Sequence, residues 1–500
     1  MAPQPELGAF VEAYDAGRAQ AVWTTLVADL ETPVSAMLKL GAERPYSFLF
    51  ESVEGGAVRG RYSAIGLKPD LVWRCFGQRS EINRQARHDP DAFAPSSEDA
   101  LADLRQLIRS TRMVLPSELP PMAAGLFGYL AYDMVRRMER LPEVNPDVLG
   151  IPDAVFTRPT VVAIFDNVQD QVVIVTPVWP SAGLSARAAY DLARERLADV
   201  VADFDRGLPH RSLDRGPVHL PEARSNVTRE RYHEMVERAK EYIRAGDIFQ
   251  VVPSQRFELD FDLPAFSLYR SLRRLNPSPF LFHLDFDGFS LVGSSPEILV
   301  RLRDGTVTIR PIAGTRRRGR DREEDAALSA DLLGDPKELA EHLMLLDLGR
   351  NDVGRVAEVG TVRVTEKMIV ELYSHVMHIV SNVEGRIREG ADALDALIAG
   401  FPAGTVSGAP KVRAMEIIDE LESERRGIYA GAVGYFGADG TMDTCIALRT
   451  ALVKDRTMFV QAGGGVVADS DPEAEYQESR NKAQALIRAA EEAVRFARGG

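Results

Sequence analysis

The chain has 500 residues, of which 45% are hydrophobic and 27% charged, and its formal net charge is −14. This length exceeds one ordinary hydrophobic core and predicts two domains or one large compound domain. The acidic balance argues against nucleic acid as the main partner, and the lack of an apolar run of about eighteen residues argues against a membrane span. The two cysteines, Cys75 and Cys445, exclude a disulfide framework and a cysteine-based zinc site. With no secretory signal at the start, they lead us to expect a cytoplasmic protein.

The first 204 residues are expected to form an N-terminal region of mixed helices and strands. In chain order we predict a helix at about 98–112, a strand that turns helical over 125–142, a hairpin over 159–177 and a helix over 183–204. The stretch 205–226 is rich in proline, glycine and charge and has no periodicity, which predicts a linker.

Residues 227–500 are expected to form the second region. The predicted helices cover about 228–245, 336–348, 391–398, 409–422 and 472–497, and the predicted strands cover 248–258, 279–287, 289–294, 296–303, 306–310, 361–367, 376–385, 429–437, 443–453 and 457–463. Antiparallel hairpins mixed with helices predict an α+β fold and not a parallel βαβ sheet.

Two stretches are built alike: DPKELAEH at 335–342 and DPEAEYQE at 471–478. In each, Asp-Pro is typical of a helix N-cap followed by proline at the first helical position. The pairs Glu338/Glu341 and Glu475/Glu478 are spaced three apart, so each pair shares one helix face. Two such faces could hold one hard cation such as Mg²⁺ through carboxylate oxygens. Each stretch alone could equally be a solvated acidic face.

Two glycine-rich turns could approach a ligand closely. The sequence GTVSGAPK at 404–411 opens a predicted helix and could hold an anion there, although it is not a P-loop. Gly463, Gly464 and Gly465 follow a strand and precede the second Asp-Pro helix, so their N–H groups could receive a carboxylate.

Three single residues are candidates for chemistry, each with a structural alternative. Arg449 lies among apolar residues of a predicted strand and needs an anion, which could be a ligand or a structural carboxylate. His378 lies in another apolar strand and could be a packed core residue. Glu297 could be a general acid or a strand-end cap. Neither cysteine sits in the Gly-x-Cys-x-Gly turn that a glutaminase needs.

In combination these motifs resemble the chorismate-utilising enzymes, most closely the anthranilate synthase component I group. The resemblance is strong over about 227–495 and weaker over about 10–175. The matching stretches are PIAGT at 311–315, EHLMLLDLGRND at 341–352, VMH at 376–378, FPAGTVSGAPK at 401–411, YAGAVGY at 429–435, QAGGG at 461–465 and EYQESRNK at 475–482. It implies the group's fold, large antiparallel sheets packed as a sandwich with helices outside.

The resemblance also implies roles. Glu341 and Glu478 are similar to the family's Mg²⁺ ligands, with Glu338 and Glu475 acting through water. The ion would hold the ring carboxylate of chorismate with help from Lys482 and Gly463–Gly465. Arg449 and Tyr429 resemble the clamp on the enolpyruvyl carboxylate. Glu297 would protonate the departing hydroxyl, while Thr405 and His378 flank the ring and His378 serves the later loss of pyruvate. Ala313, Gly314 and Thr315 complete the implied substrate contacts.

Two departures separate the chain from other members of the family. Aminodeoxychorismate synthases typically have a nucleophilic lysine where this chain has Ala313, and isochorismate and salicylate synthases have a lysine base near Gln250. Both departures favour anthranilate formation, which is the first committed step of tryptophan biosynthesis. The alternatives are an aminodeoxychorismate synthase component and a catalytically silent homologue that only binds chorismate or tryptophan.

A regulatory site and a partner are also implied. Glu51 and Ser52, with Asn276, Pro279, Phe280 and Leu281, resemble the two segments that bind inhibitory L-tryptophan in this group. Since the chain has no glutaminase signature, we expect ammonia from a separate glutamine amidotransferase subunit and therefore a hetero-oligomer.

Overall fold

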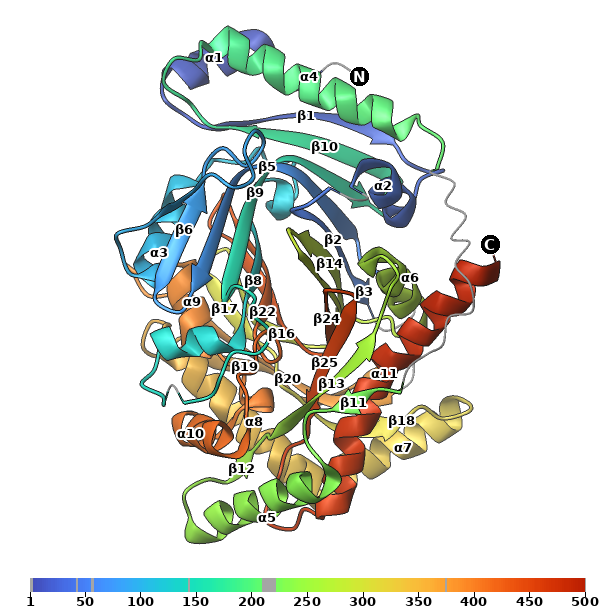
Figure 1. Ribbon diagram of the computed structural model, residues 1–500. Helices are drawn as coiled ribbons and strands as arrows, with labels where there is room; N and C mark the ends of the chain where they lie inside the picture. The colour runs from blue at the N-terminus through green and yellow to red at the C-terminus, as the bar shows by residue number, and fades with distance from the viewer. Residues whose placement is uncertain are drawn as a thin grey trace.

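The computed structural model describes residues 3–41, 44–54, 58–142, 144–208, 222–373 and 376–499. Antiparallel strands form one large branched sheet, and helices cover its outer faces (Figure 1). The predicted α+β class, with antiparallel sheets packed as a sandwich inside a layer of helices, is confirmed.

Two long strands form the root from which the sheet branches. β5 (Tyr62–Phe76) and β9 (Ala154–Asp166) pair along almost their whole length. β10 (Gln171–Val178) and β1 (Gln20–Val27) continue the sheet beyond β9. The helices over this end are α1 (Leu7–Asp15), α2 (Pro33–Leu40) and α4 (Ala186–Phe204), and their buried apolar faces pack on it (Figure 1).

The first arm of the sheet begins at β5. In spatial order its strands are β2 (Ser47–Glu51), β14 (Phe280–Phe286), β15 (Phe289–Ser295), β24 (Thr450–Lys454), β25 (Thr457–Gly463), β13 (Ser254–Asp260) and β11 (Arg224–Ser225). Two helices, α6 (Ala265–Leu275) and α11 (Pro472–Gly499), pack against its outer side.

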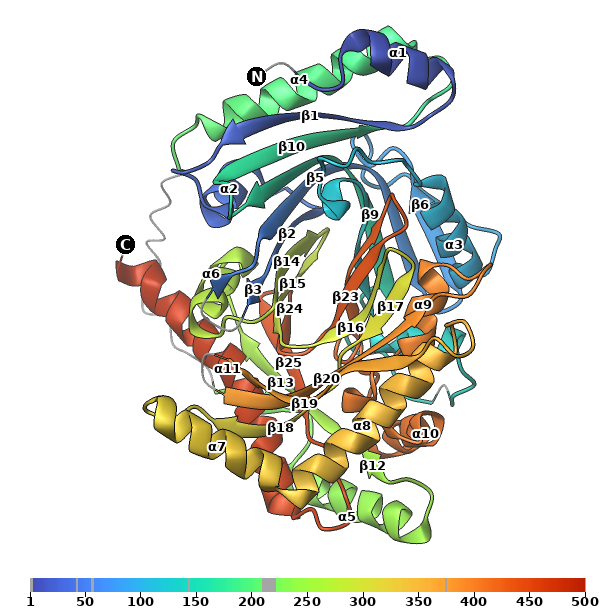
Figure 2. The same ribbon diagram turned by 180° about the vertical axis from the view of Figure 1, so that it is seen from behind.

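The second arm begins at β9. In spatial order its strands are β8 (Gly125–Leu130), β22 (Ala432–Gly437), β23 (Met442–Ile446), β16 (Ile298–Arg303), β17 (Thr306–Ile309) and β20 (Val376–Arg386), and β20 also pairs with β18 (Ile312–Arg317) and β19 (Arg363–Leu372). The helices on this side are α7 (Arg322–Gly334), α8 (Pro336–Gly354) and α9 (Ala393–Gly400). Figure 2 shows the two arms diverging from the root.

Smaller elements complete the fold. The far half of β5 carries β6 (Arg79–Asn83), which pairs with β7 (Phe93–Pro95), beside α3 (Ala100–Ser110). Two short pairs are β3 (Val53–Glu54) with β4 (Val58–Arg59) and β12 (Gln250–Val251) with β21 (Gly408–Ala409). The remaining helices are α5 (Arg229–Ala245), α10 (Lys411–Leu421) and the 3₁₀ turns η1 (Pro121–Ala123), η2 (Tyr132–Arg137) and η3 (Gly404–Val406).

Aromatic side chains join the arms near the root. Phe48 of β2 stacks on Phe127 of β8 with ring centroids 4.5 Å apart, and Phe127 stacks on Tyr435 of β22 at 5.6 Å. Stacked aromatic pairs add directional packing to the burial of apolar area. Farther from the root, a large cavity lies between the arms.

The structure confirms most of the predicted elements and corrects two. The single strand expected over 248–258 is wrong, because β12 and β13 are separate strands that belong to different sheets. The hairpin over 159–177 is β9–β10, and both Asp-Pro helices begin at their prolines. The elements α6, α7 and β18 were not predicted. The single strand expected over 443–453 is wrong, because the chain leaves β23 after Ile446 and turns at Arg449, which has a φ of 47°, before it enters β24 in the other arm.

The expected division of the chain stays a prediction. Most of the linker expected over 205–226, residues 209–221, lies outside the described residues. Strands from the first 204 residues pair with strands from the second region, β2 with β14 and β8 with β22.

Candidate active site

Two crossings of the chain between the arms create the centre of the site. Glu297 lies in the crossing from β15 to β16, and Arg449 lies in the crossing from β23 to β24. The crossings run side by side, because the Ile446 N–H donates to the Glu297 carbonyl oxygen and the Ser294 N–H donates to the Arg449 carbonyl oxygen, both at 3.1 Å. The fold thus brings together an acid and a cation that are distant in sequence.

Glu297 is placed as a buried proton donor. Glu297 is only 6% exposed, and the Thr405 hydroxyl donates to its Oε1 at 3.2 Å. Burial raises the pKa of Glu297 from 4.5 to about 8, while the hydrogen bonds from Thr405 and from the Ile312 backbone act in the opposite direction. The carboxyl group therefore keeps its proton at neutral pH, as a general acid must. The contact also brings together two of the residues predicted to be catalytic.

Arg449 is a partly buried cation in need of an anion. Burial lowers its pKa, and the nearby Tyr373 acts in the opposite direction. No carboxylate in the described parts of the chain forms an ion pair with its guanidinium. Without such an ion pair, the structural-carboxylate alternative is disfavoured. A charge withdrawn from water still needs a counter-charge, which a ligand could supply. A ligand carboxylate gripped by both prongs of the guanidinium would satisfy it.

His378 lies on β20 opposite Thr315 of β18, next to a bulge at Gly314. Its Nδ1 is 3.1 Å from the Gly314 carbonyl oxygen and 3.0 Å from the Thr315 hydroxyl. A carbonyl oxygen only accepts, so Nδ1 carries the proton and Nε2 keeps its lone pair. Burial lowers the pKa of His378 and the charge of Arg449 acts with it, while the hydrogen bond with Gly314 and the charge of Glu371 act in the opposite direction. The lowered pKa favours the neutral imidazole, in which Nε2 is available as a base. The adjacent Ala313 is buried in β18.

The two Asp-Pro helices begin as the sequence indicates. Asp335 accepts from the N–H groups of Lys337 at 3.0 Å and Glu338 at 3.4 Å, and Asp471 accepts from the Ala474 N–H at 2.9 Å. The caps satisfy backbone donors that would otherwise have no partner. They fix the rotation of α8 and α11, and with it the direction of the four glutamates.

The glutamates on α8 and α11 lie close enough for their charges to repel one another. Burial raises the pKa of Glu341, and the charges of Glu338 and Glu478 raise it further. Burial also raises the pKa of Glu475, and Glu478 adds to this effect. Mutual repulsion of this kind shows that α8 and α11 face a common space. Within the described ranges, however, no three His, Cys, Asp or Glu side chains already stand close enough together to hold a metal ion.

Cations and a glycine turn surround these carboxylates. Arg316 pairs with Glu338 at 2.9 Å, and Lys482 pairs with Glu478 at 2.8 Å. The Lys482 ammonium also donates to the Gly463 carbonyl oxygen at 2.9 Å. A Cβ atom on Gly464 would lie 2.8 Å from Glu475 Oε2, so a larger residue there would push this carboxylate aside.

A buried network, which the sequence analysis missed, supports Tyr429 and the turn at Thr405. Arg426 forms two hydrogen bonds with Glu422, at 2.7 and 3.0 Å, and donates to the Val406 carbonyl oxygen at 2.7 Å. Its guanidinium lies 5.3 Å from the centre of the Tyr429 ring. Burial raises the pKa of Tyr429 to about 12, although the Gly463 N–H bonds to its hydroxyl oxygen. The spacing of Glu422 and Arg426 by four residues was the available signal.

A second buried pair fixes the glycine-rich turn to α8. The Lys411 ammonium lies 2.9 and 2.8 Å from the two oxygens of Asp352, and both side chains are less than a tenth exposed. The pair connects the start of α10 to the end of α8. The motif at 404–411 therefore contributes structure through its lysine, in addition to the Thr405 contact.

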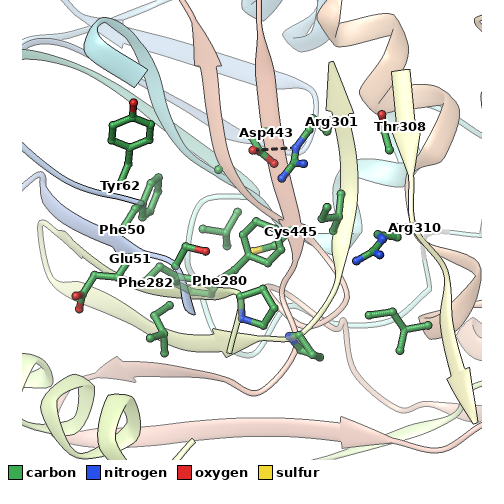
Figure 3. Close-up of a pocket in the computed structure, with 18 of the residues that line it drawn as sticks. Phe50, Glu51, Tyr62, Phe280, Phe282, Arg301, Thr308, Arg310, Asp443 and Cys445 are labelled. Carbon is green, nitrogen blue, oxygen red and sulfur yellow. Dashed lines mark hydrogen bonds and ion pairs between the residues drawn. The ribbon is translucent and has the colours of Figure 1, made fainter. Parts of the chain in front are cut away.

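A cavity of about 960 Å³ lies between the arms, and most of the residues predicted to bind tryptophan line it. Figure 3 shows Phe50, Phe280 and Tyr62 on one side of it and Arg310 and Thr308 on the other. The predicted residues that line it are Glu51, Ser52, Pro279, Phe280 and Leu281. Asn276 is not among the lining residues; it ends α6, and its carbonyl oxygen accepts from the Ser294 hydroxyl.

Glu51 already has protein partners at the edge of this cavity. Arg273 donates to its two oxygens at 2.6 and 2.8 Å, and the Tyr269 hydroxyl donates to Oε2 at 2.5 Å. An arriving ammonium group would therefore share Glu51 with Arg273.

None of the described helices is both long enough and apolar enough to cross a bilayer.

Comparison with known proteins agrees with this site. A family model for chorismate binding enzymes matches residues 57–488. This chain belongs to the chorismate-binding enzyme family.

Three similar proteins within that family carry the name anthranilate synthase component I. Anthranilate synthase component 1 from Cereibacter sphaeroides is 65% identical over 98% of each chain, and that from Pseudomonas putida is 50% identical over 93% of each. The crystal structure of anthranilate synthase component I from Streptococcus pneumoniae TIGR4 is 38% identical, has a TM-score of 0.74, and aligns with 86% of this chain and 92% of its own. The resemblance to the component I group is confirmed, and the chain is an enzyme of the chorismate-utilising family.

Proposed function

We propose that this protein is the chorismate-converting subunit of anthranilate synthase. The reaction consumes chorismate and ammonia and yields anthranilate, pyruvate and water. The observation that carries the proposal is the placement, in adjacent crossings of the chain, of Glu297, a buried acid protonated at neutral pH, and Arg449, a partly buried cation with no carboxylate partner in the described chain. A dianionic substrate with a poor leaving group requires both.

In the first step Glu297 acts as the general acid. It transfers its proton to the ring hydroxyl, which leaves as water while the ring double bonds shift and ammonia forms a bond to ring carbon 2. The Thr405 hydroxyl holds Glu297 Oε1 in place for this transfer. Arg449, with Tyr429, binds the enolpyruvyl carboxylate and so fixes the ring relative to the acid.

In the second step His378 acts as the base. Its Nε2 removes the proton from ring carbon 2, the electrons re-form the aromatic ring, and the enolpyruvyl group leaves as pyruvate. The Nδ1 contact with the Gly314 carbonyl oxygen holds the tautomer that this role needs.

The acidic helices fit a hard divalent cation. Carboxylate oxygens are the ligands that Mg²⁺ prefers, and a cation would relieve the repulsion that raises the pKa values of Glu341 and Glu475. Glu341 and Glu478 would bind it directly, and Glu338 and Glu475 through water. When bound, Mg²⁺ supplies positive charge for the ring carboxylate, which Lys482 and the turn at Gly463–Gly465 also contact.

Two positions favour ammonia chemistry over the family's other reactions. Ala313 offers no nucleophile in the place of the lysine of aminodeoxychorismate synthases. Gln250 cannot act as the base that activates water in isochorismate synthases; its Nε2 donates to Glu341 Oε1 at 3.4 Å, and its buried Oε1 has no partner among the described residues. That free acceptor lies beside the acidic helices, where an ammonia molecule could donate to it.

The nitrogen source would be a glutamine amidotransferase subunit. Burial raises the pKa of the Cys75 thiol to about 12 and that of the Cys445 thiol as well, so neither cysteine is available as a glutaminase nucleophile. The component 1 designation of the relatives agrees with a second component.

L-tryptophan would act as a feedback inhibitor that binds in the inter-arm cavity. Support comes from the aromatic and polar walls of that cavity and from Pro279, Phe280 and Leu281 on β14 and the turn before it. Activity that is unchanged by millimolar tryptophan would contradict this part of the proposal.

The catalytic proposal is tested by incubating the protein with chorismate, Mg²⁺ and an ammonium salt. Anthranilate, detected by its blue fluorescence, is the expected product. Accumulated aminodeoxychorismate would instead identify the aminodeoxychorismate synthase reaction. Chorismate recovered unchanged would identify a silent homologue.

A further inference from the structure

Tyr373 lies between the catalytic centre and the inter-arm cavity. It directly follows β19, and its N–H donates to the Val376 carbonyl oxygen at 2.8 Å. Its ring meets the His378 imidazole edge to face, with centroids 5.3 Å apart and planes at 66°. Tyr373 is therefore the aromatic neighbour of the residue proposed to be the base.

Two other residues hold this ring in place. The Tyr373 hydroxyl donates to Glu371 Oε2 at 3.0 Å. Arg310 of β17 in turn donates to the two oxygens of Glu371 at 2.6 and 3.2 Å. Burial raises the pKa of Tyr373 well above its ordinary value, so the hydroxyl stays a donor. A charge-assisted pair anchored on another strand thus fixes the direction of the ring.

The ring also shares an environment with the other catalytic groups. Tyr373 acts on the pKa of Arg449, and the charge of Glu297 acts on the pKa of Tyr373. Within the described chain, His378 has hydrogen bonds only at Nδ1. Packing against neighbouring side chains must therefore limit the rotation of the imidazole. The aromatic ring that packs against the imidazole is that of Tyr373.

We propose that Tyr373, held by Glu371 and Arg310, is the positioning residue that aims His378 Nε2 at ring carbon 2. The inference rests on the proposed function and deepens it. Tyr373 touches the base and acts through it, so its loss would affect the second step, aromatisation, more than the first step, addition of ammonia.

The test uses the full-length protein with chorismate, Mg²⁺ and ammonium. For the wild type and for Tyr373→Leu and Tyr373→Phe we would measure chorismate consumed and anthranilate formed, and separate the non-aromatic amino intermediate by chromatography. Tyr242→Leu is the control, since Tyr242 lies on α5 and is not among the residues that line this cavity.

The leucine variant is expected to lower the ratio of anthranilate formed to chorismate consumed by about tenfold, since small misplacement of a catalytic group has large effects on rate. The difference should appear as released intermediate. The phenylalanine variant keeps the ring and loses only the tie to Glu371, so it should restore part of the ratio and remain measurably below the wild type. The control should keep the wild-type ratio.

Other outcomes would overturn the inference. If both variants turn over more slowly yet convert all consumed chorismate to anthranilate, Tyr373 has only a structural role. If the leucine variant does not fold, a wild-type ratio in Tyr373→Phe overturns the anchored positioning. A wild-type protein that forms no anthranilate refutes the proposed function itself, which is a distinct result.

Discussion

Replacing Glu297 with glutamine tests the protonated acid at the centre of the site. Glutamine keeps the size of the side chain and an oxygen that can accept from the Thr405 hydroxyl, but it does not titrate. Burial raises the pKa of Glu297 from 4.5 to about 8. The folded state therefore holds a proton that the unfolded state releases between these values, so the stability of the wild type falls as the pH rises through this window.

The size of the effect follows from the shift in pKa. One pKa unit corresponds to about 1.4 kcal/mol, so the shift corresponds to about 5 kcal/mol in total, of which about 4 kcal/mol falls between about pH 5 and about pH 9. The contribution is fully present below the unfolded pKa of 4.5 and is lost above pH 8. The stability of Glu297→Gln relative to the wild type should rise by this amount across the window.

The assay is urea unfolding of both proteins at several pH values, with Glu389→Gln as control because Glu389 is exposed. The control should track the wild type. In parallel, Glu297→Gln should lower the rate of anthranilate formation by about 10²- to 10⁴-fold. The wild-type rate, normalised to free ammonia, should fall about tenfold per unit above pH 8. Unfolding curves of Glu297→Gln and wild type that keep a constant separation at every pH would refute the buried-acid reasoning.

Three further variants test other parts of the site. Glu341→Gln should weaken Mg²⁺ binding about tenfold or more in calorimetry without loss of thermal stability, because it removes a repelled carboxylate; unchanged affinity would exclude Glu341 as a ligand. Lys411→Met should lower the free energy of unfolding in urea by about 3–5 kcal/mol, because Asp352 is left buried and unpaired, and adding Asp352→Leu should recover part of the loss; no recovery would contradict the pairing. Glu51→Gln weakens the contact with Arg273 and should raise the tryptophan concentration for half inhibition about tenfold; an unshifted inhibition curve would remove Glu51 from that site.

The sequence was most informative where local chemistry decides the structure. The caps at Asp335 and Asp471 and the prolines after them set the first turns of α8 and α11, and both helices begin there. The alternating β-branched run after Pro159 became the β9–β10 hairpin. These features depend on neighbours along the chain, so periodicity and capping rules were sufficient.

The sequence was least informative where distant segments meet. Nothing near Arg449 shows that the strand breaks there, because the break is caused by passage from one arm to the other. The pairing of Glu51 with Arg273 and the contact of Tyr373 with His378 likewise depend on how β2, α6, β19 and β20 are assembled. The candidate residues could be identified from motifs, but their partners could not.

The interleaving of early and late strands has a consequence for how the chain folds. β2 lies between β5 and β14, and β8 lies between β9 and β22, so two strands made early pair with strands made much later. During synthesis the edges of the early strands stay unpaired until the later strands are made, and unpaired edges are prone to pair with other chains. Closure of both arms is thus a late event with high contact order, and we expect the complete chain, not its N-terminal portion, to be the unit that folds.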